Sequence, residues 1–209
     1  MDANARERRK TAAAAGFDGD VAAVVASLTD PDHRVRAAGL RSSDRVGNLT
    51  TEVLASALAD PHPHVRITAL ELAARRTEPP IGVLLGDTDD RVIEQAAWTC
   101  GERRHVPADT ARLVELAGSH DDPLVREAAV AALGAIGHDD GLSAILTATT
   151  DKPAIRRRAV LALSAFDGSE VDEVWQRARH DRDRQVRDAV DELLGPETSL
   201  STSADGNPE

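Results

Sequence analysis

The chain has 209 residues, a formal charge of −11, and an aromatic content of 2% with no tyrosine. So few aromatic residues exclude a core built from large rings and favour closely packed helices of Ala, Val and Leu in one extended domain. The acidic excess disfavours nonspecific binding of nucleic acids, because their phosphates attract basic surfaces.

Cys100 is the only cysteine, so the chain can form neither an intrachain disulfide nor a zinc site made of several cysteines. The N-terminal residues include a basic segment before Ala12 but no apolar stretch long enough for a signal peptide. No run approaches the length of a membrane span. We therefore expect a cytoplasmic protein with no membrane partner and no cofactor.

Residues 1–19 are predicted to form an N-terminal capping helix. Residues 3–15 resemble the second helix of a degraded leading repeat, since Phe17-Asp18-Gly19 is echoed by Phe166-Asp167-Gly168. The many charges of this segment suit the solvent-facing end of a repeat array.

Residues 20–195 are predicted to form a repeat domain. Six times, a branched apolar residue opens an Ala-rich helical run a few residues after an aspartate. These residues are Val35, Val65, Val92, Val125, Ile155 and Val186, and successive members are 30, 27, 33, 30 and 31 residues apart. Such a period is typical of stacked helix pairs, so the sequence predicts an all-α fold. Pro79-Pro80 accounts for the 27-residue spacing because it shortens the first helix of the third pair.

Each pair is predicted to turn at an aspartate, often followed by proline, as in Asp30-Pro31 and Asp60-Pro61. We expect the Asp to accept hydrogen bonds from the free amides of the second helix, with Pro in the first helical position. After Gly195, residues 196–209 lose the apolar period and are predicted to form a disordered tail.

The segment DDPLVREAAVAALGAIG at residues 121–137 resembles the HEAT-repeat family, in particular the short bacterial and archaeal type grouped with phycobilin-lyase HEAT-like repeats. The resemblance implies a right-handed α-solenoid of about six helix pairs. It also implies a ladder that joins successive repeats through the Asp of the turn and the Arg after the branched residue. The predicted ladder residues are Asp30, Arg36, Asp60, Arg66, Asp121, Arg126, Asp151, Arg156, Asp181 and Arg187. Ile93 interrupts this pattern in the third unit.

The resemblance places the second helices on the concave face, where solenoids commonly bind partners. The side chains expected to point outward there include Trp98, Glu71, Glu94, Glu127, Arg157 and Arg41. Trp98 is the leading candidate because tryptophan often anchors protein interfaces. The alternative is that Trp98 only fills space beside the shortened first helix of the third pair.

We found no other strong site. The seven histidines lie mostly in turns and are interpreted as solvated, although turn residues on neighbouring repeats would be able to converge on a metal. Deoxyhypusine hydroxylase, an iron enzyme built on the same repeat, carries His-Glu pairs, and this chain has no His-Glu dipeptide. Cys100 falls at a core position and is interpreted as a small buried residue.

We therefore predict a noncatalytic scaffold or adaptor that binds another protein and does not bind nucleic acids. One alternative is an accessory subunit of a lyase or other modifying enzyme, as in bilin lyases. A further alternative is a DNA repair protein of the HEAT-like type, which the acidic charge and the lack of tyrosine disfavour.

Overall fold

The fold is an α-solenoid in which six helix pairs follow one leading helix. The computed structural model describes residues 3–195, so the predicted tail at 196–209 lies outside the described residues. The leading helix is α1 (Ala3–Asp18). The first members of the pairs are α2 (Val21–Ser27), α4 (Thr51–Leu58), the 3-10 helix η1 (Gly82–Gly86), α7 (Pro107–Ser119), α9 (Leu142–Ala148) and α11 (Ser169–Ala178). The second members are α3 (His33–Arg45), α5 (Pro63–Ala73), α6 (Asp90–Gly101), α8 (Pro123–Ile136), α10 (Pro153–Ala162) and α12 (Arg184–Leu194). Two short 3-10 helices, η2 (Asp139–Gly141) and η3 (Leu163–Ala165), lie in connections.

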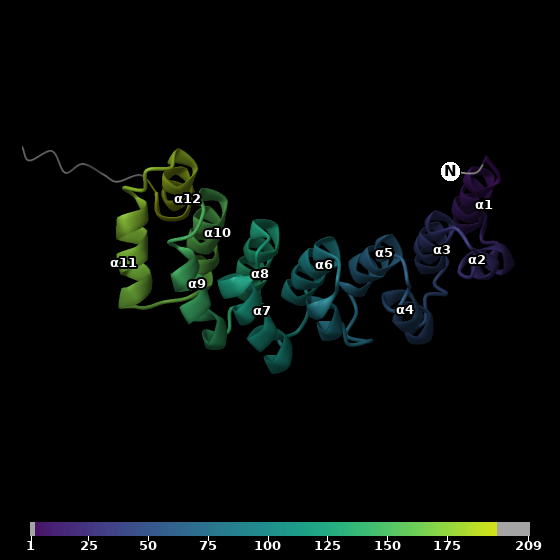
Figure 1. Cartoon of the computed structure of the whole chain (residues 1–209), viewed down its shortest axis with the longest axis horizontal. Coiled ribbons are helices and arrows are strands. Elements are labelled where there is room, and N and C mark those ends of the chain that lie inside the picture. Colours follow the sequence, from purple (N-terminus) through teal and green to yellow (C-terminus); the bar gives the residue numbers. More distant parts are fainter. Residues whose placement is uncertain (1–2, 196–209) are drawn as a thin grey trace, which may run out of the picture.

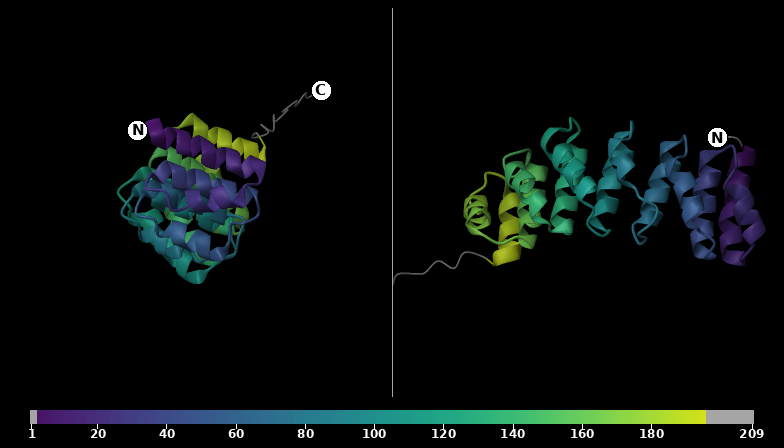
Figure 2. Two further views of the ribbon diagram at one scale, coloured as in Figure 1. Left: turned by 90° about the vertical axis from the view of Figure 1, so that its right-hand side faces the viewer. Right: turned by 90° about the horizontal axis from the view of Figure 1, so that it is seen from below.

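The second helices and α1 form one row along the concave side of an arc, and the first helices form the convex row (Figure 1). Views along and across the long axis show successive units stacked side by side (Figure 2). The predicted leading helix occupies the place of a second helix, since the Ser42 hydroxyl on α3 donates to the Ala12 carbonyl on α1 at 2.8 Å.

The core follows the predicted period. The six branched residues that open the second helices are each at most 1% exposed: Val35, Val65, Val92, Val125, Ile155 and Val186. Four alanines that share one position of the repeat are fully buried: Ala69, Ala96, Ala129 and Ala159. The methyl groups of these alanines are small enough to let neighbouring second helices approach closely.

The predicted helix starts need a correction in register. Asp32, two residues after Asp30, is the N-cap of α3, and its carboxylate accepts from the Arg34 amide. In α5 the cap is His62, whose Nδ1 accepts from the His64 amide, and Pro63 occupies the first turn. The Asp of the Asp-Pro pair instead accepts from the amide of the cap residue itself: Asp30 accepts from Asp32 N at 2.8 Å. Proline can occupy the turn before the cap because its ring fixes φ without requiring a helix.

The third pair is irregular, as Pro79-Pro80 predicts. A single 3-10 helix, η1, stands in place of a first helix. The connection before it is held by Arg103, which donates from Nη1 to the Pro79 carbonyl at 3.0 Å and from Nη2 to the Thr77 carbonyl.

Arginine and aspartate side chains join consecutive repeats in bidentate pairs. The shortest N to O distances are 2.7 Å for Arg36–Asp60, Arg66–Asp87 and Arg156–Asp181, and 2.8 Å for Arg126–Asp151. Fork-to-fork geometry of this kind combines two charge-assisted hydrogen bonds. The guanidinium of Arg156 also lowers the pKa of the Asp181 carboxyl below its ordinary value. We refer to these contacts as the Arg–Asp ladder.

Each ladder arginine also ties down its own turn. The Nη1 atom of Arg36 donates to the Asp30 carbonyl at 2.8 Å, and Arg66 makes the same contact with the Asp60 carbonyl at 2.8 Å. At the C-terminal end Arg187 makes this backbone contact, to the Asp181 carbonyl at 2.6 Å, and no ladder ion pair within residues 3–195. The ladder extends to the leading helix, where Arg8 pairs with Asp30 at 2.7 Å, which the sequence analysis did not predict.

The prediction that Asp121 belongs to the ladder is wrong. The position that matches Asp30 in the fourth pair is His120, whose Nδ1 accepts from the Asp122 amide at 3.2 Å. Asp121 is exposed and contributes only its carbonyl, which accepts from Arg126 at 3.1 Å. The preceding arginine position holds Ile93, which is 4% exposed. Both partners of the third link are therefore replaced: Ile93 is buried, and His120 Nε2 lies 3.8 Å from Asp90 Oδ1 on α6.

Candidate functional site

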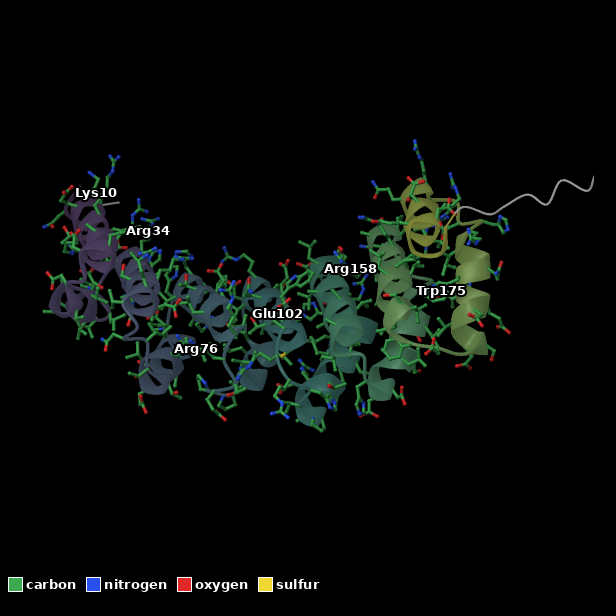
Figure 3. The ribbon with its side chains drawn as sticks, turned by 180° about the vertical axis from the view of Figure 1, so that it is seen from behind. Lys10, Arg34, Arg76, Glu102, Arg158 and Trp175 are labelled. Atoms are coloured by element: carbon green, nitrogen blue, oxygen red, sulfur yellow. The ribbon has the colours of Figure 1, made fainter. Side chains whose placement is uncertain are left out.

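The inner row of helices carries all six side chains predicted to contact a partner. Trp98 on α6 is 39% exposed, so it is neither a fully buried packing residue nor a free surface side chain. The guanidinium carbon of Arg158 on α10 lies 5.5 Å from the centre of its ring, within the range of a cation–π contact. Figure 3 shows Arg158 on the concave side of the arc.

Arg158 also pairs with Glu127 on the intervening helix α8, with 3.3 Å between Nη2 and Oε1. Trp98, Glu127 and Arg158 thus connect three consecutive inner helices, and we call them the Trp98 cluster. The sequence analysis named Arg157 instead of Arg158. Arg157 is exposed, whereas Arg158 is half-buried and makes both contacts.

The other predicted contact residues lie on the helices of this cluster or toward the N-terminus. Glu94 is half-buried on α6, and its pKa is raised by burial and by the carboxylates of Asp122 and Glu127. Toward the N-terminus, Arg41 on α3 and Glu71 on α5 form an exposed ion pair at 2.9 Å, which contributes little to stability. The concave face therefore has an acidic centre around Trp98.

The sequence predicted that the histidines are solvated turn residues, but several of them pack against one another. The rings of His33 and His62, from successive repeats, stack with centroids 3.4 Å apart and an interplanar angle of 4°. His64 meets His33 edge to face at 5.9 Å. The pKa of His33 is lowered by burial and by His62, and that of His64 by burial and by Arg41.

This histidine stack predicts a stability that rises with pH. A histidine whose pKa is lowered by folding binds its proton more weakly in the folded chain, so the free energy of unfolding falls as pH drops below about 6.5. We expect the melting temperature to be lower at about pH 5.5 than at about pH 7.5, and the difference to shrink in His33→Asn. Thermal melts followed by circular dichroism measure this. His180→Asn, at an exposed position, is the matched control, and an equal change in both variants would contradict the role of the stack.

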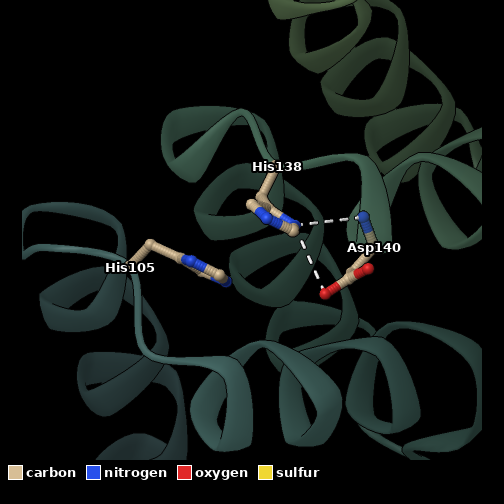
Figure 4. Close-up of side chains that lie close together, drawn as sticks. All are labelled: His105, His138 and Asp140. Atoms are coloured by element: carbon tan, nitrogen blue, oxygen red, sulfur yellow. Dashed lines mark hydrogen bonds and ion pairs between the residues drawn. The ribbon is translucent and has the colours of Figure 1, made fainter.

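A second cluster brings together His105, His138 and Asp140, whose potential ligand atoms lie within 4.8 Å of one another. The two rings are nearly parallel, with centroids 4.1 Å apart and an angle of 16° (Figure 4). Imidazole binds a metal through a nitrogen lone pair in the ring plane. Parallel stacked rings direct these lone pairs along separate planes, so one ring must rotate before both can reach one ion. The Nδ1 atom of His138 also accepts from the Asp140 amide at 3.3 Å, and we interpret the cluster as a turn contact.

Cys100 lines a hollow of about 360 Å³ together with Asp109 and Arg103. Its Sγ lies 4.0 Å from Asp109 Oδ2, and burial raises the pKa of the thiol to about 12. Since the thiolate is the reactive form, this cysteine is inert near neutral pH. The side chain is 5% exposed, in agreement with its interpretation as a core residue.

None of the helices within residues 3–195 has the length and apolar character needed to cross a membrane.

Comparisons with solved structures found a helical repeat protein of similar fold and two weaker matches. A designed armadillo repeat protein in complex with the peptide (KR)4 is 17% identical with a TM-score of 0.62, and the match covers 82% of this chain and 96% of that one. Human deoxyhypusine hydroxylase is 18% identical with a TM-score of 0.43 over 92% of this chain and 80% of that one. An engineered protein is 20% identical with a TM-score of 0.43 over 91% and 87%. A search of curated proteins found no match.

The sequence itself matches a known repeat. The profile of the HEAT repeats family matches residues 51–132, 77–157 and 110–195, three overlapping stretches that include the second to sixth helix pairs. Together with the paired helices and their repeating core, this match shows that the chain belongs to the HEAT-repeat family.

Proposed function

We propose that the protein is a noncatalytic scaffold or adaptor that binds another protein on its concave face. The observation that carries this proposal is the Trp98 cluster. A large apolar ring, 39% exposed, lies on the inner face beside the Glu127–Arg158 pair. Such an anchor surrounded by charges of both signs is typical of the centre of a protein interface.

The fold supports the same location. The designed armadillo repeat protein of similar architecture was solved with a bound peptide, and solenoids offer their partners an extended inner surface. The alternative function as an accessory subunit of a lyase or other modifying enzyme uses the same surface and differs in the identity of the bound protein. The DNA repair alternative requires phosphate contacts, which the acidic residues around Trp98 oppose.

We expect site-specific photo-crosslinking from position 98 to identify the partner. A photoreactive phenylalanine analogue replaces Trp98 in the full chain, and the matched control carries the same group at Val83. Val83 is on η1 in the opposite row and is 83% exposed. The proposal expects a protein in native lysate that cross-links from position 98 and not from position 83. Equal cross-linking from both positions contradicts a concave interface.

Trp98→Ala should then weaken binding of the cross-linked protein by about 2 kcal/mol, or about 30-fold, because the anchor ring is removed. Isothermal titration calorimetry measures the affinity, and Val83→Ala is the control. We expect the helical circular dichroism signal to be unchanged. If Trp98→Ala instead lowers the melting temperature and leaves the affinity unchanged, the ring is a packing residue and the proposal fails.

A further inference from the structure

A groove on the concave side, between α1 and α3, has a cationic lining. It measures about 440 Å³ and is bordered by Arg9, Lys10, Arg34, Arg41 and Arg45. No carboxylate is among its lining residues, although the formal charge of the whole chain is −11. Figure 3 shows Lys10 and Arg34 at this end of the concave side.

Helix periodicity explains why the cations gather there. Residues 34, 38, 41 and 45 follow the spacing i, i+4, i+7 and i+11, so they form one stripe along α3. The corresponding stripe on α8, at residues 124, 128, 131 and 135, contains only leucine and alanine. No other second helix carries more than one arginine at these four positions, so the three arginines of α3 are not a general requirement of the repeat. A capping helix needs a polar outer face, but this does not require charges of one sign on its inner groove.

Several of these cations remain available to a ligand. Neither Arg9 nor Arg34 forms an ion pair within residues 3–195, and Lys10 has only an exposed contact with Glu7 at 3.3 Å. Arg45 lies over the exposed ring of Phe17 at 4.0 Å. By contrast, the arginines of the Arg–Asp ladder are held in bidentate pairs in the turns.

The shape of the groove limits what can fill it. Small side chains, Ala13, Ala38 and Ser42, lie between the cations and leave room for a polypeptide backbone. A long polyanion lying further along the concave face would meet Glu71 and then the acidic centre at Glu94. A short acidic segment avoids this repulsion because it ends within the groove.

We propose that the groove between α1 and α3 binds a short acidic segment, rich in Asp or Glu, of a protein partner. This inference rests on the proposed function and names one chemical feature of the partner. The cationic groups of Arg9, Lys10 and Arg34 pair with the carboxylates of the segment, and the Trp98 cluster contacts a separate part of the same partner.

Fluorescence anisotropy with the full chain and fluorescein-labelled hexaglutamate tests this inference. We expect saturable binding at about 50 mM salt that weakens at about 200 mM. Lys10→Glu/Arg34→Glu should weaken hexaglutamate binding at least about tenfold. The control Arg104→Glu/Arg182→Glu changes the net charge equally at two exposed arginines outside the groove and should have a much smaller effect.

The outcomes are distinct. Equal losses in the two variants indicate diffuse attraction and overturn the inference, as does the absence of hexaglutamate binding. Tighter binding of a labelled six-nucleotide oligouridylate than of hexaglutamate overturns it in favour of a nucleic acid. Circular dichroism checks folding, and Lys10→Gln/Arg34→Gln replaces the charge reversal if that variant does not fold. If hexaglutamate fails to bind while Trp98→Ala still weakens the cross-linked partner, this inference falls and the proposed function stands.

Discussion

Arg156→Met should lower the free energy of unfolding by about 3 kcal/mol, because it leaves Asp181 as a buried carboxylate without its counter-ion. The Arg156 and Asp181 side chains are only 7% and 16% exposed, and the arginine also donates to the Asp151 carbonyl at 2.9 Å. Methionine keeps most of the apolar stem, so the loss reports the guanidinium group. Urea denaturation followed by circular dichroism measures the change.

The adjacent Arg157→Met is the matched control, since Arg157 is exposed on the same helix, and it should change the free energy of unfolding by less than about 0.5 kcal/mol. Asp181→Asn retains an oxygen that can accept from the Asp183 amide. The double variant Arg156→Met/Asp181→Asn should therefore lose less stability than the two single variants added together. A loss from Arg156→Met as small as that from Arg157→Met would show that the ladder pair behaves as an ordinary surface ion pair.

Gly134→Ala should lower the free energy of unfolding by about 2 kcal/mol, because α8 and α10 touch at this residue. A Cβ atom at Gly134 would lie 2.5 Å from Ala162 Cβ and 2.7 Å from Ala162 Cα. The same contact recurs one repeat earlier, where a Cβ at Gly101 would lie 3.1 Å from Ala132 Cα. Because the obstacle includes backbone, one helix must move away from the other to admit the methyl group.

Gly118→Ala is the opposite-sign control. Gly118 lies in α7 with no atom within 4 Å of an added Cβ, and it is not among the glycines with positive φ. Alanine there should raise the free energy of unfolding by about 0.5 to 1 kcal/mol through helix propensity. Denaturant titrations measure the free energy of unfolding of both variants. Destabilisation by Gly118→Ala as large as that by Gly134→Ala would contradict the close-contact explanation.

The repeat architecture could be predicted from the sequence because its signal recurs. A branched residue such as Val125 appears at the same place in six units, and each unit confirms the register of the others. The cap positions were harder to predict from the sequence. Asp30 and Asp32 are both able to cap a helix, and only the backbone path shows that Asp32 caps α3 while Asp30 accepts from the cap amide.

The candidate site was harder to predict because adjacent residues on a helix face different neighbours. Trp98 was identified, but Arg157 was chosen over Arg158 although only Arg158 reaches the Trp98 ring and Glu127. The cationic groove was missed for another reason. Its lining comes from α1 and α3 with His64 of α5, and the charges of α1 had been assigned to a solvent-facing cap.

The broken link in the Arg–Asp ladder bears on how such an array can change in evolution. Links such as Arg36–Asp60 and Arg156–Asp181 use the same groups at the same distance of 2.7 Å. A unit joined by such links can therefore take the place of another without loss of the ion pair. Duplication or loss of one such unit leaves a compatible junction behind. The junction between the third and fourth units is different, because Ile93 and His120 stand where the other links have arginine and aspartate, and His120 Nε2 lies 3.8 Å from Asp90 Oδ1, so an arginine or aspartate copied from another unit would not find its usual partner there. The third and fourth units are therefore expected to be inherited as one block, with substitutions at positions 93 and 120 that depend on each other.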